Sequence, residues 1–367
     1  MKMISPDAKE MIYSGRIDHS DPVRPVFIYA ASFFKIRFTG NICRLHIINH
    51  RAWAQDRVGV ILDGVQGKIL LSDDDKEHIY DIRTDCVRTE NGIDPEEDHF
   101  FKELTDGYHE LMVFKRQDGG QHYFTFTGLE IGENESIESA TPLPTKKLEV
   151  IGDSVSCGEV CEAVENVGMP DPENNDGIYS NSWYSYSWQV ARNLDMELHD
   201  TSQGGISLFD KTGWFNMPDL RGTESCYEKL KYNPPLGENE YDCSEWIPDV
   251  IVLAIGQNDS SPVDIMKEDY NSQKSRKWRE GYGAFIRRLR SLYPSAEIVC
   301  ATTLLMHDPS WDRAIDEVVA GLSDKKVHHF MYTRTGKATP GHPRIPEHDE
   351  MARELTGYIA SLGKQER

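Results

Sequence analysis

Two patterns of hydrophobic and polar positions divide the chain. From residue 1 to about 140, short runs rich in β-branched and aromatic residues are separated by turn residues such as Leu62-Asp63-Gly64. No long helical pattern interrupts these runs, which are VRPVFIYA, FFKIRFTG, ICRLHIINH, VGVILDG, GKILLSD and HYFTFTGLEI. Short strands separated by turns predict a β-sandwich over residues 1–140, of the jelly-roll type.

Residues 146–367 follow a different pattern, in which apolar strands alternate with amphipathic helices. KLEVIGD and DVIVLAIG are typical of buried strands, and the segments 181–195 and 274–294 are typical of helices. A connector rich in Pro, Thr and Ser, residues 138–147, separates the two patterns. The second half therefore predicts a parallel sheet covered by helices on both faces, a three-layer α/β/α domain.

Small and polar residues follow three of the predicted parallel strands. Ser154 follows the first strand, Gly204-Gly205 the second, and Gln257-Asn258-Asp259 the third. In such sheets ligands bind at the carboxyl ends of the strands, so these residues are expected along one rim. Taken singly, they have ordinary interpretations as a turn serine, a loop and a helix N-cap.

Together these residues could supply the nucleophile and the oxyanion donors of an acyl-transfer site. A serine hydroxyl is a weak nucleophile until a base and oxyanion donors surround it. Ser154 would attack, and its own N–H, the N–H of Gly205 and the amide of Asn258 would hold the oxyanion. His342, in a Gly- and Pro-rich loop before the last predicted helix, is the candidate base.

The blocks GDSVSCG, SQGGISLF, GQND and HPRIPEHDEMA resemble those of the SGNH (GDSL-type) hydrolase superfamily. The chain is most similar to carbohydrate esterase family 2, the acetyl xylan esterase-like enzymes, which place a jelly-roll domain before the hydrolase domain. SGRIDHSD, FFKIRFTGN and VGVILDG resemble that first domain. The resemblance implies Ser154 as nucleophile, His342 as base, and Ser154, Gly205 and Asn258 as the oxyanion hole. It implies removal of O-acetyl groups from sugars, such as xylan fragments, with no metal or organic cofactor.

One departure concerns the residue that orients the base. Most members of the superfamily carry an Asp three residues before the His, where this sequence has Thr339. The resemblance to family 2 then implies a Ser–His dyad whose ring is oriented by a main-chain carbonyl. The nearby acids are not expected to replace the Asp, since Glu347 and Asp349 fit the opening of the final helix.

Composition narrows the choice of partners. A net charge of -21 on 367 residues argues against binding to nucleic acid or to an anionic membrane. The start, MKMISPDAKE, lacks an apolar leader, which favours a cytoplasmic location, or secretion if a leader was trimmed. The seven cysteines are odd in number and favour free thiols, although Cys157 and Cys161 could form a disulfide or a metal pair.

Several alternatives stay open at this level. The polar segment 159–179 would form a wall of the cleft or a solvated loop, and its Asp171/Glu173/Asn175 spacing only faintly resembles a calcium loop. Trp214 is the tryptophan chosen as a candidate sugar-stacking platform. The alternative functions are a lipase or thioesterase acting on short acyl esters, and a non-catalytic carbohydrate-binding protein. Neither the natural sugar nor the oligomeric state follows from the sequence.

Overall fold

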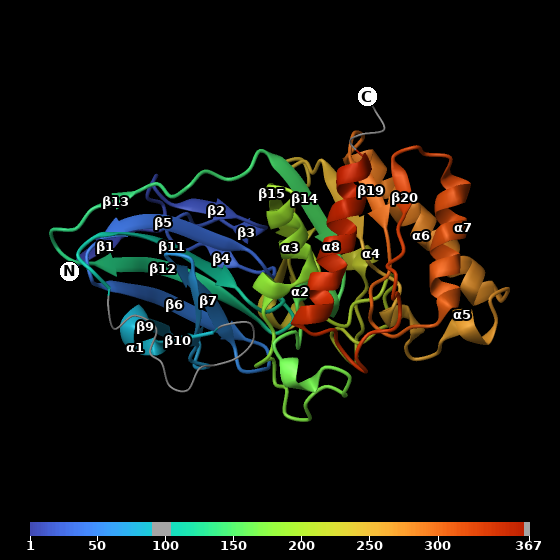
Figure 1. Cartoon of the computed structure of the whole chain (residues 1–367), viewed down its shortest axis with the longest axis horizontal. Helices are drawn as coiled ribbons and strands as arrows, with labels where there is room; N and C mark the ends of the chain where they lie inside the picture. The colour runs from blue at the N-terminus through green and yellow to red at the C-terminus, as the bar shows by residue number, and fades with distance from the viewer. Residues whose placement is uncertain (90–103, 363–367) are drawn as a thin grey trace.

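A computed structural model describes residues 1–89 and 104–362. Its first half is a sandwich of two antiparallel sheets (Figure 1). The strand order of the first sheet is β3-β4-β12-β6-β9, with β1 paired to β12. The strand order of the second sheet is β10-β8-β7-β11-β5-β13, with β2 paired to β5. The strands of the first sheet are β1 (Lys2–Ile4), β3 (Ile17–Asp18), β4 (Val26–Phe27), β6 (Cys43–Arg51), β9 (Glu77–Asp81) and β12 (His122–Ile131). Those of the second are β2 (Ile12–Ser14), β5 (Phe33–Thr39), β7 (Arg57–Leu62), β8 (Val65–Leu70), β10 (Cys86–Arg88), β11 (Tyr108–Lys115) and β13 (Ile137–Glu138).

Aromatic side chains fill the space between the two sheets. Phe34 on β5 stacks on Phe126 of β12, with ring centroids 4.1 Å apart, and Phe27 stacks on Phe124 at 4.5 Å. All four rings are fully buried in one continuous cluster with the aliphatic residues of both sheets. The alternating pattern of these strands thus becomes the sandwich core.

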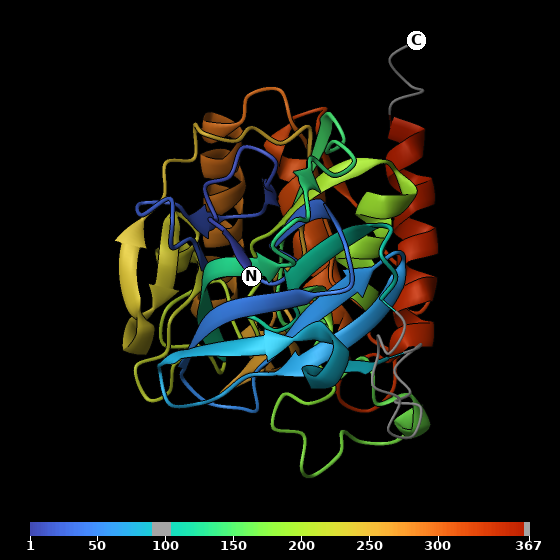
Figure 2. The ribbon, with the colours of Figure 1, turned by 90° about the vertical axis from the view of Figure 1, so that its left-hand side faces the viewer.

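The second half is a five-stranded parallel sheet between two layers of helices (Figures 1 and 2). The strand order is β15-β14-β18-β19-β20, and β14 is near the centre. Val150 of β14 packs with α3 and α8, and its neighbour Ile151 packs with α6 and α7, because successive strand side chains point to opposite faces. The elements are β14 (Lys146–Ile151), α3 (Tyr186–Asn193), β15 (Met196–Asp200), β18 (Val250–Leu253), α6 (Gln273–Leu292), β19 (Glu297–Cys300), α7 (Pro309–Leu322), β20 (Val327–His329) and α8 (Ile345–Leu362).

Short elements occupy the connections of both domains. They are α1 (Ile82–Asp85) in the sandwich, and then α2 (Ser154–Cys157), η1 (Val164–Asn166), η2 (Ser182–Tyr184), α4 (Thr223–Cys226), β16 (Lys229–Asn233), η3 (Pro234–Leu236), β17 (Gly237–Glu240), η4 (Asn258–Ser260) and α5 (Ile265–Glu268). β16 and β17 form a separate antiparallel hairpin.

The predicted fold class, a β-sandwich followed by an α/β/α domain, is confirmed, and the details differ in places. β11 lies in the middle of its sheet although its segment was not among the predicted strands. The predicted helix over 181–195 is split, because Ser185 is the N-cap of α3 and separates it from η2. Of VRPVFIYA, only Val26–Phe27 is strand.

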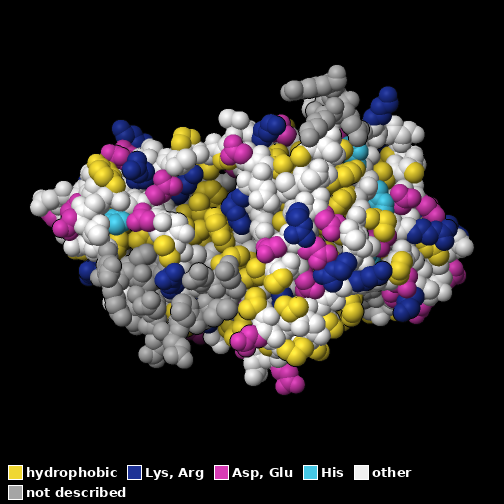
Figure 3. Space-filling model, in the orientation of Figure 1, with side chains coloured by type: hydrophobic (Ala, Val, Ile, Leu, Met, Phe, Trp, Pro, Cys, Tyr) yellow, Lys and Arg dark blue, Asp and Glu magenta, His cyan; other side chains and the backbone are white. Residues whose placement is uncertain are grey.

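Buried ion pairs join the sandwich to the α/β/α domain. Arg16 Nη2 lies 2.8 Å from Glu149 Oε1 on β14, and both side chains are 1% exposed. Arg116 and Glu162 form a second pair that is equally buried. On the outer face, acidic and basic side chains are interspersed (Figure 3). Over residues 1–89 and 104–362, no helix has both the length and the apolar composition needed to cross a membrane.

Candidate active site

Ser154 lies at a tight turn between β14 and α2. The Asp153 side chain accepts a hydrogen bond from Val155 N at 3.0 Å and so caps the short helix, which ends at Gly158 with φ +75°. A side chain at Gly152 would come within 2.1 Å of the Ser156 hydroxyl, so the turn requires glycine there. Ser154 is only 3% exposed, yet it lines a cleft, and its hydroxyl has no hydrogen-bond partner in the described part of the chain.

His342 is held by a carboxylate. Its Nδ1 lies 2.6 Å from Asp171 Oδ2, and its backbone N donates to Asp171 Oδ1 at 3.0 Å. Arg344 Nη1, fully buried, lies 2.8 Å from the same Oδ1. Partial burial would raise the pKa of Asp171, but its bonds to His342 and Arg344 lower the pKa to about 2. The expectation that a main-chain carbonyl orients the ring is therefore wrong.

The acid comes from the polar segment 159–179, which folds back over the histidine loop. Gly168 N donates to the Thr339 hydroxyl at 2.9 Å, and Ile345 N donates to Cys161 O at 3.0 Å. Thr339 thus stands where the superfamily usually has its Asp and anchors the segment that brings a different Asp to the ring. Glu347 does not reach the ring, because it accepts hydrogen bonds from Thr339 N and Arg344 N.

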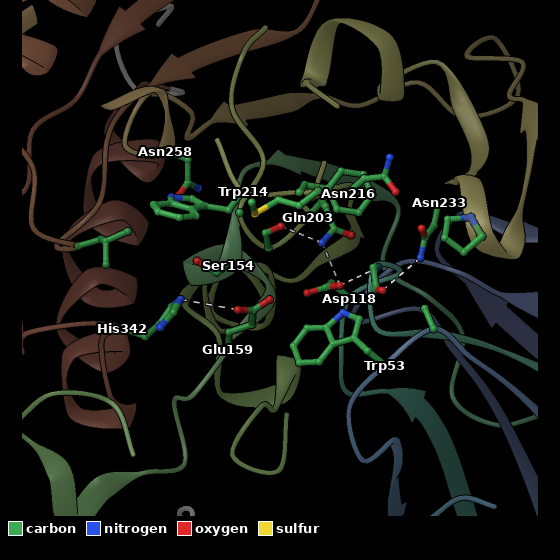
Figure 4. Close-up of a pocket in the computed structure, with 18 of the residues that line it drawn as sticks. Trp53, Asp118, Ser154, Glu159, Gln203, Trp214, Asn216, Asn233, Asn258 and His342 are labelled. Carbon is green, nitrogen blue, oxygen red and sulfur yellow. Dashed lines mark hydrogen bonds and ion pairs between the residues drawn. The ribbon is translucent and has the colours of Figure 1, made fainter. Parts of the chain in front are cut away.

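The other nitrogen of the ring faces the cleft. His342 Nε2 lies 3.6 Å from Glu159 Oε2, and Ser154 and His342 line the same cleft without a hydrogen bond between them (Figure 4). Catalytic hydrogen bonds are often long before a substrate binds. With Nδ1–H donated to Asp171, Nε2 presents its lone pair toward the space beside Ser154, which is the tautomer that a general base needs.

Two backbone N–H groups are available as oxyanion donors. Ser154 N opens α2, and Gly205 N lies in the turn after β15; among the described residues neither has an acceptor. Gly205 has φ +72°, and a Cβ there would lie 2.9 Å from Trp214 Cβ, so the turn favours glycine. Asn258 Nδ2 donates to Ile206 O at 3.1 Å and to Asp153 Oδ2 at the longer distance of 3.3 Å. Asn258 would have to give up the longer bond to meet an oxyanion.

Asp153 connects the serine turn to the asparagine turn. Its Oδ2 accepts hydrogen bonds from both Gln257 and Asn258, while its Oδ1 caps α2. Burial raises the pKa of Asp153 to about 6, although the hydrogen bonds from Val155 N and Gln257 act to lower it. This one buried carboxyl therefore fixes the two turns relative to each other.

The cleft has a volume of about 650 Å³ and is lined by both domains (Figure 4). Trp214 is 59% exposed on one wall, and Trp53, from the sandwich, is 50% exposed on another. Asp118 and Glu159 also line it. The sequence analysis missed Trp53 and Asp118, because only the docking of the two domains brings them to the nucleophile, whereas Glu159 opens the segment 159–179 that was considered as a wall of the cleft.

The remaining sequence hypotheses can be checked directly. All seven cysteines are free and buried, so Cys157 and Cys161 do not form a disulfide. Asp171, from the segment with a faint calcium-loop spacing, is bonded to His342 and Arg344 instead. Outside residues 90–103 and 363–367, no group of three or more His, Cys, Asp or Glu side chains has the arrangement of a metal site.

Comparisons with known proteins agree with this architecture. Residues 13–93 match the family described as Carbohydrate esterase 2 N-terminal. Over 363 residues the chain is 25% identical to the cellulase/esterase CelE of Acetivibrio thermocellus, a match covering 96% of this chain and 39% of CelE. It is 26% identical over 268 residues to an acetylxylan esterase/glucomannan deacetylase of Cellvibrio japonicus, covering 70% of this chain and 68% of that protein.

A solved structure extends the likeness to the fold of both domains. The family two carbohydrate esterase from Clostridium thermocellum, solved in complex with cellohexaose, superposes with a TM-score of 0.74 at 22% identity, covering 96% of this chain and 99% of that one. The chain is therefore similar in sequence to family 2 carbohydrate esterases and shares the two-domain fold of the solved one.

Proposed function

We propose that the protein is a carbohydrate acetylesterase that removes O-acetyl groups from sugars or xylan-type polysaccharide fragments. The observation that carries this proposal is the Ser154 hydroxyl, which has no hydrogen-bond partner among residues 1–89 and 104–362 and shares a cleft with His342, whose Nδ1 is hydrogen-bonded to Asp171. The names of the relatives, an acetylxylan esterase/glucomannan deacetylase among them, support acetylated polysaccharide as the substrate class.

The geometry supports a covalent mechanism in two halves. Ser154 Oγ attacks the acetyl carbonyl carbon while His342 Nε2 takes its proton, and ionised Asp171 stabilises the imidazolium that forms. The N–H groups of Ser154 and Gly205, joined by the Asn258 amide, hold the oxyanion. The sugar oxygen leaves with the proton from His342. Water then attacks the acetyl-enzyme, gives its proton to Nε2, and releases acetate as Ser154 recovers its hydrogen.

The mixed lining of the cleft gives little support to the alternative of a long-chain lipase or thioesterase. Amide and carboxyl side chains are interspersed with apolar ones such as Trp214, Met217 and Leu305, whereas a long acyl chain needs a continuous apolar trough. These polar lining residues are Asp118, Glu159, Gln203, Asn216, Asn233 and Asn258. The second alternative is a non-catalytic carbohydrate-binding protein. Such a protein would not need the arrangement of Ser154, His342 and Asp171.

Hydrolysis of p-nitrophenyl esters of increasing acyl length, followed by release of acetate from acetylated xylan, tests the proposal. We expect acetate esters to be preferred and acetylated xylan to be a substrate. Ser154→Ala should lower kcat by roughly a thousandfold or more while remaining folded, and exposed Ser295→Ala is the matched control. A preference for octanoate over acetate would favour the lipase alternative, and no turnover of any ester would favour the binding protein.

A further inference from the structure

The two exposed tryptophans of the chain line the same cleft. All seven tryptophans lie within the described residues, and only two of them are at least half exposed. These are Trp53, at 50%, and Trp214, at 59%. Both line the space around Ser154, and Figure 4 shows Trp53 on the Asp118 side and Trp214 on the Asn258 side. An exposed tryptophan leaves a large apolar face in water, which a sugar ring can cover by stacking.

Trp53 stands on a rigid backbone, although its side chain is exposed. Its N–H donates to Gln121 O at 3.1 Å, and Gln55 N donates to Asp176 O at 2.9 Å, which ties this turn to the segment 159–179. Trp53 is part of none of the buried apolar clusters. The backbone that carries the side chain is therefore held in place, and the side chain has no role in the core, as a preorganised binding surface requires.

Polar groups fill the wall between Trp53 and the nucleophile. Asp118 Oδ1 accepts hydrogen bonds from Gly120 N at 2.7 Å and Gln203 Nε2 at 3.0 Å, and the carboxyls of Asp118 and Glu159 both lie beside Gly204. A Cβ at Gly204 would lie 1.9 Å from Glu159 Oε1 and 2.8 Å from Asp118 Oδ2, so the glycine leaves room for both carboxyls.

The environment of the second carboxyl of this pair favours its protonated form. Burial, and the hydrogen bond and charge of Asp118, raise the pKa of Glu159 well above its usual value. A protonated carboxyl both donates and accepts hydrogen bonds, as a sugar hydroxyl does. Its Oε2 points toward His342 and the reacting centre. A second ring in the cleft could thus stack on an aromatic face and still satisfy its hydroxyls.

We propose that the sandwich wall of the cleft is a second sugar subsite, in which Trp53 stacks on the sugar next to the one that carries the ester at Ser154, and the Asp118–Glu159 pair binds its hydroxyls. This inference rests on the proposed esterase function and narrows its substrate to chains of at least two linked pyranose rings. The N-terminal sandwich then contributes directly to substrate recognition.

The test compares monoacetates of methyl β-xylopyranoside and of xylobiose. We expect the wild-type protein to show a kcat/KM for the xylobiose ester about tenfold or more above that for the monosaccharide ester. Trp53→Ala should reduce this preference to within about threefold, and Trp53→Phe should restore most of it. Tyr108→Ala is the matched control, because Tyr108 is an aromatic side chain of the same domain with 55% exposure that does not line the cleft.

The outcomes separate the subsite from the function. A wild-type protein that hydrolyses both sugar esters equally well, or a Trp53→Ala variant that keeps the full preference, overturns the subsite and leaves the esterase function standing. If p-nitrophenyl acetate is hydrolysed but neither sugar ester is, the proposed function itself has failed. Trp53 is exposed, so we expect Trp53→Ala to fold, and Trp53→Phe gives a second variant if it does not.

Discussion

At the residue scale, the structure adds an acid that the sequence did not indicate. Ser154, Gly205, Asn258 and His342 could be predicted because each follows a strand or precedes a helix in a recognisable block. Asp171 could not, because it lies 171 residues before His342 in a polar loop and reaches the ring only through tertiary folding. A spacing rule along the chain does not detect such a partner.

Neutralising Asp171 should impair catalysis strongly. Asp171→Asn removes the charge that fixes the ring tautomer, and loss of the corresponding Asp in a serine protease template costs about 10⁴ in kcat. We expect a fall of about 10³–10⁴ in kcat for p-nitrophenyl acetate with the fold retained. Asp349→Asn, on the exposed side of α8, and Asp308→Asn should stay within about tenfold of wild type. If all three variants lowered kcat equally and only slightly, Asp171 would have no catalytic role, and Ser154 and His342 would act as a dyad.

Asn258 should act on the transition state more than on binding. Its amide can reach the oxyanion by leaving Asp153, the more distant of its two acceptors. Asn258→Ala should therefore lower kcat by about 10²–10³ with little change in KM. Steady-state kinetics on p-nitrophenyl acetate measures both constants, and an effect confined to KM would make Asn258 a binding residue.

Glu159 should make stability depend on pH. Its folded pKa is raised above the usual 4.5, so the folded state holds a proton that the unfolded chain releases. The folded state therefore carries no free-energy penalty from Glu159 below about pH 4.5, where the carboxyl is protonated in both states. As the pH rises toward the folded pKa, the unfolded chain is stabilised by ionisation of Glu159 and the free energy of unfolding falls. Glu159→Gln removes this penalty, and its Tm relative to wild type should be higher at pH 8 than at pH 4.

The control for that experiment is Glu165→Gln in the same segment, since Glu165 is exposed. Its Tm difference from wild type should be the same at both pH values. A difference that is independent of pH for Glu159→Gln as well would contradict the raised pKa of Glu159 in the folded protein.

At the element scale, the sequence indicated most strands and helices but not their neighbours. β12 was predicted over its full length, because HYFTFTGLEI is a continuous β-branched and aromatic run. β11 was missed, since YHELMVFK contains Glu, Leu and Met, which also suit helices, and its pairing with β5 and β7 decides the outcome. Pairing between strands that are distant in the sequence cannot be recognised from the residues of one strand alone.

The segment 159–179 is the element on which the site depends most. The Thr339 hydroxyl accepts a hydrogen bond from Gly168 N and is buried, so Thr339→Val keeps the shape and loses the anchor. A single lost hydrogen bond of about 1 kcal/mol should loosen Asp171 and lower kcat by several-fold. Hydrogen exchange of the segment 159–179 should become faster. Thr141→Val, at an exposed hydrogen-bonded threonine, should change neither, and unchanged exchange in Thr339→Val would contradict the anchoring role.

At the scale of the whole molecule, the cleft lies where the sandwich meets the α/β/α domain, and both apolar clusters and buried ion pairs join the two. The composition and the block order predicted two folds in one chain, but not that they share an active-site wall. Arg16 and Glu149 are separated by 133 residues and pair in the interior, which no local pattern could indicate.

Breaking that pair should destabilise the entire protein. Arg16→Met leaves Glu149 buried without its cation, and such a loss typically costs about 3–5 kcal/mol. Urea unfolding followed by both fluorescence and circular dichroism should show the drop in a single transition. Arg37→Met, which removes an exposed pair with Glu138 at 3.7 Å, should change stability by less than about 1 kcal/mol. Two separate transitions would show that the domains fold independently.

The most direct test of the account is covalent labelling of the nucleophile. Diethyl p-nitrophenyl phosphate should inactivate the protein, and peptide mass spectrometry should find one diethylphosphoryl group per chain on the peptide that contains Ser154. Ser154→Ala should be neither labelled nor active. A folded Ser154→Ala protein that still hydrolyses p-nitrophenyl acetate at the wild-type rate, or inactivation accompanied by a label on another residue, would contradict the claim that Ser154 carries the acyl group.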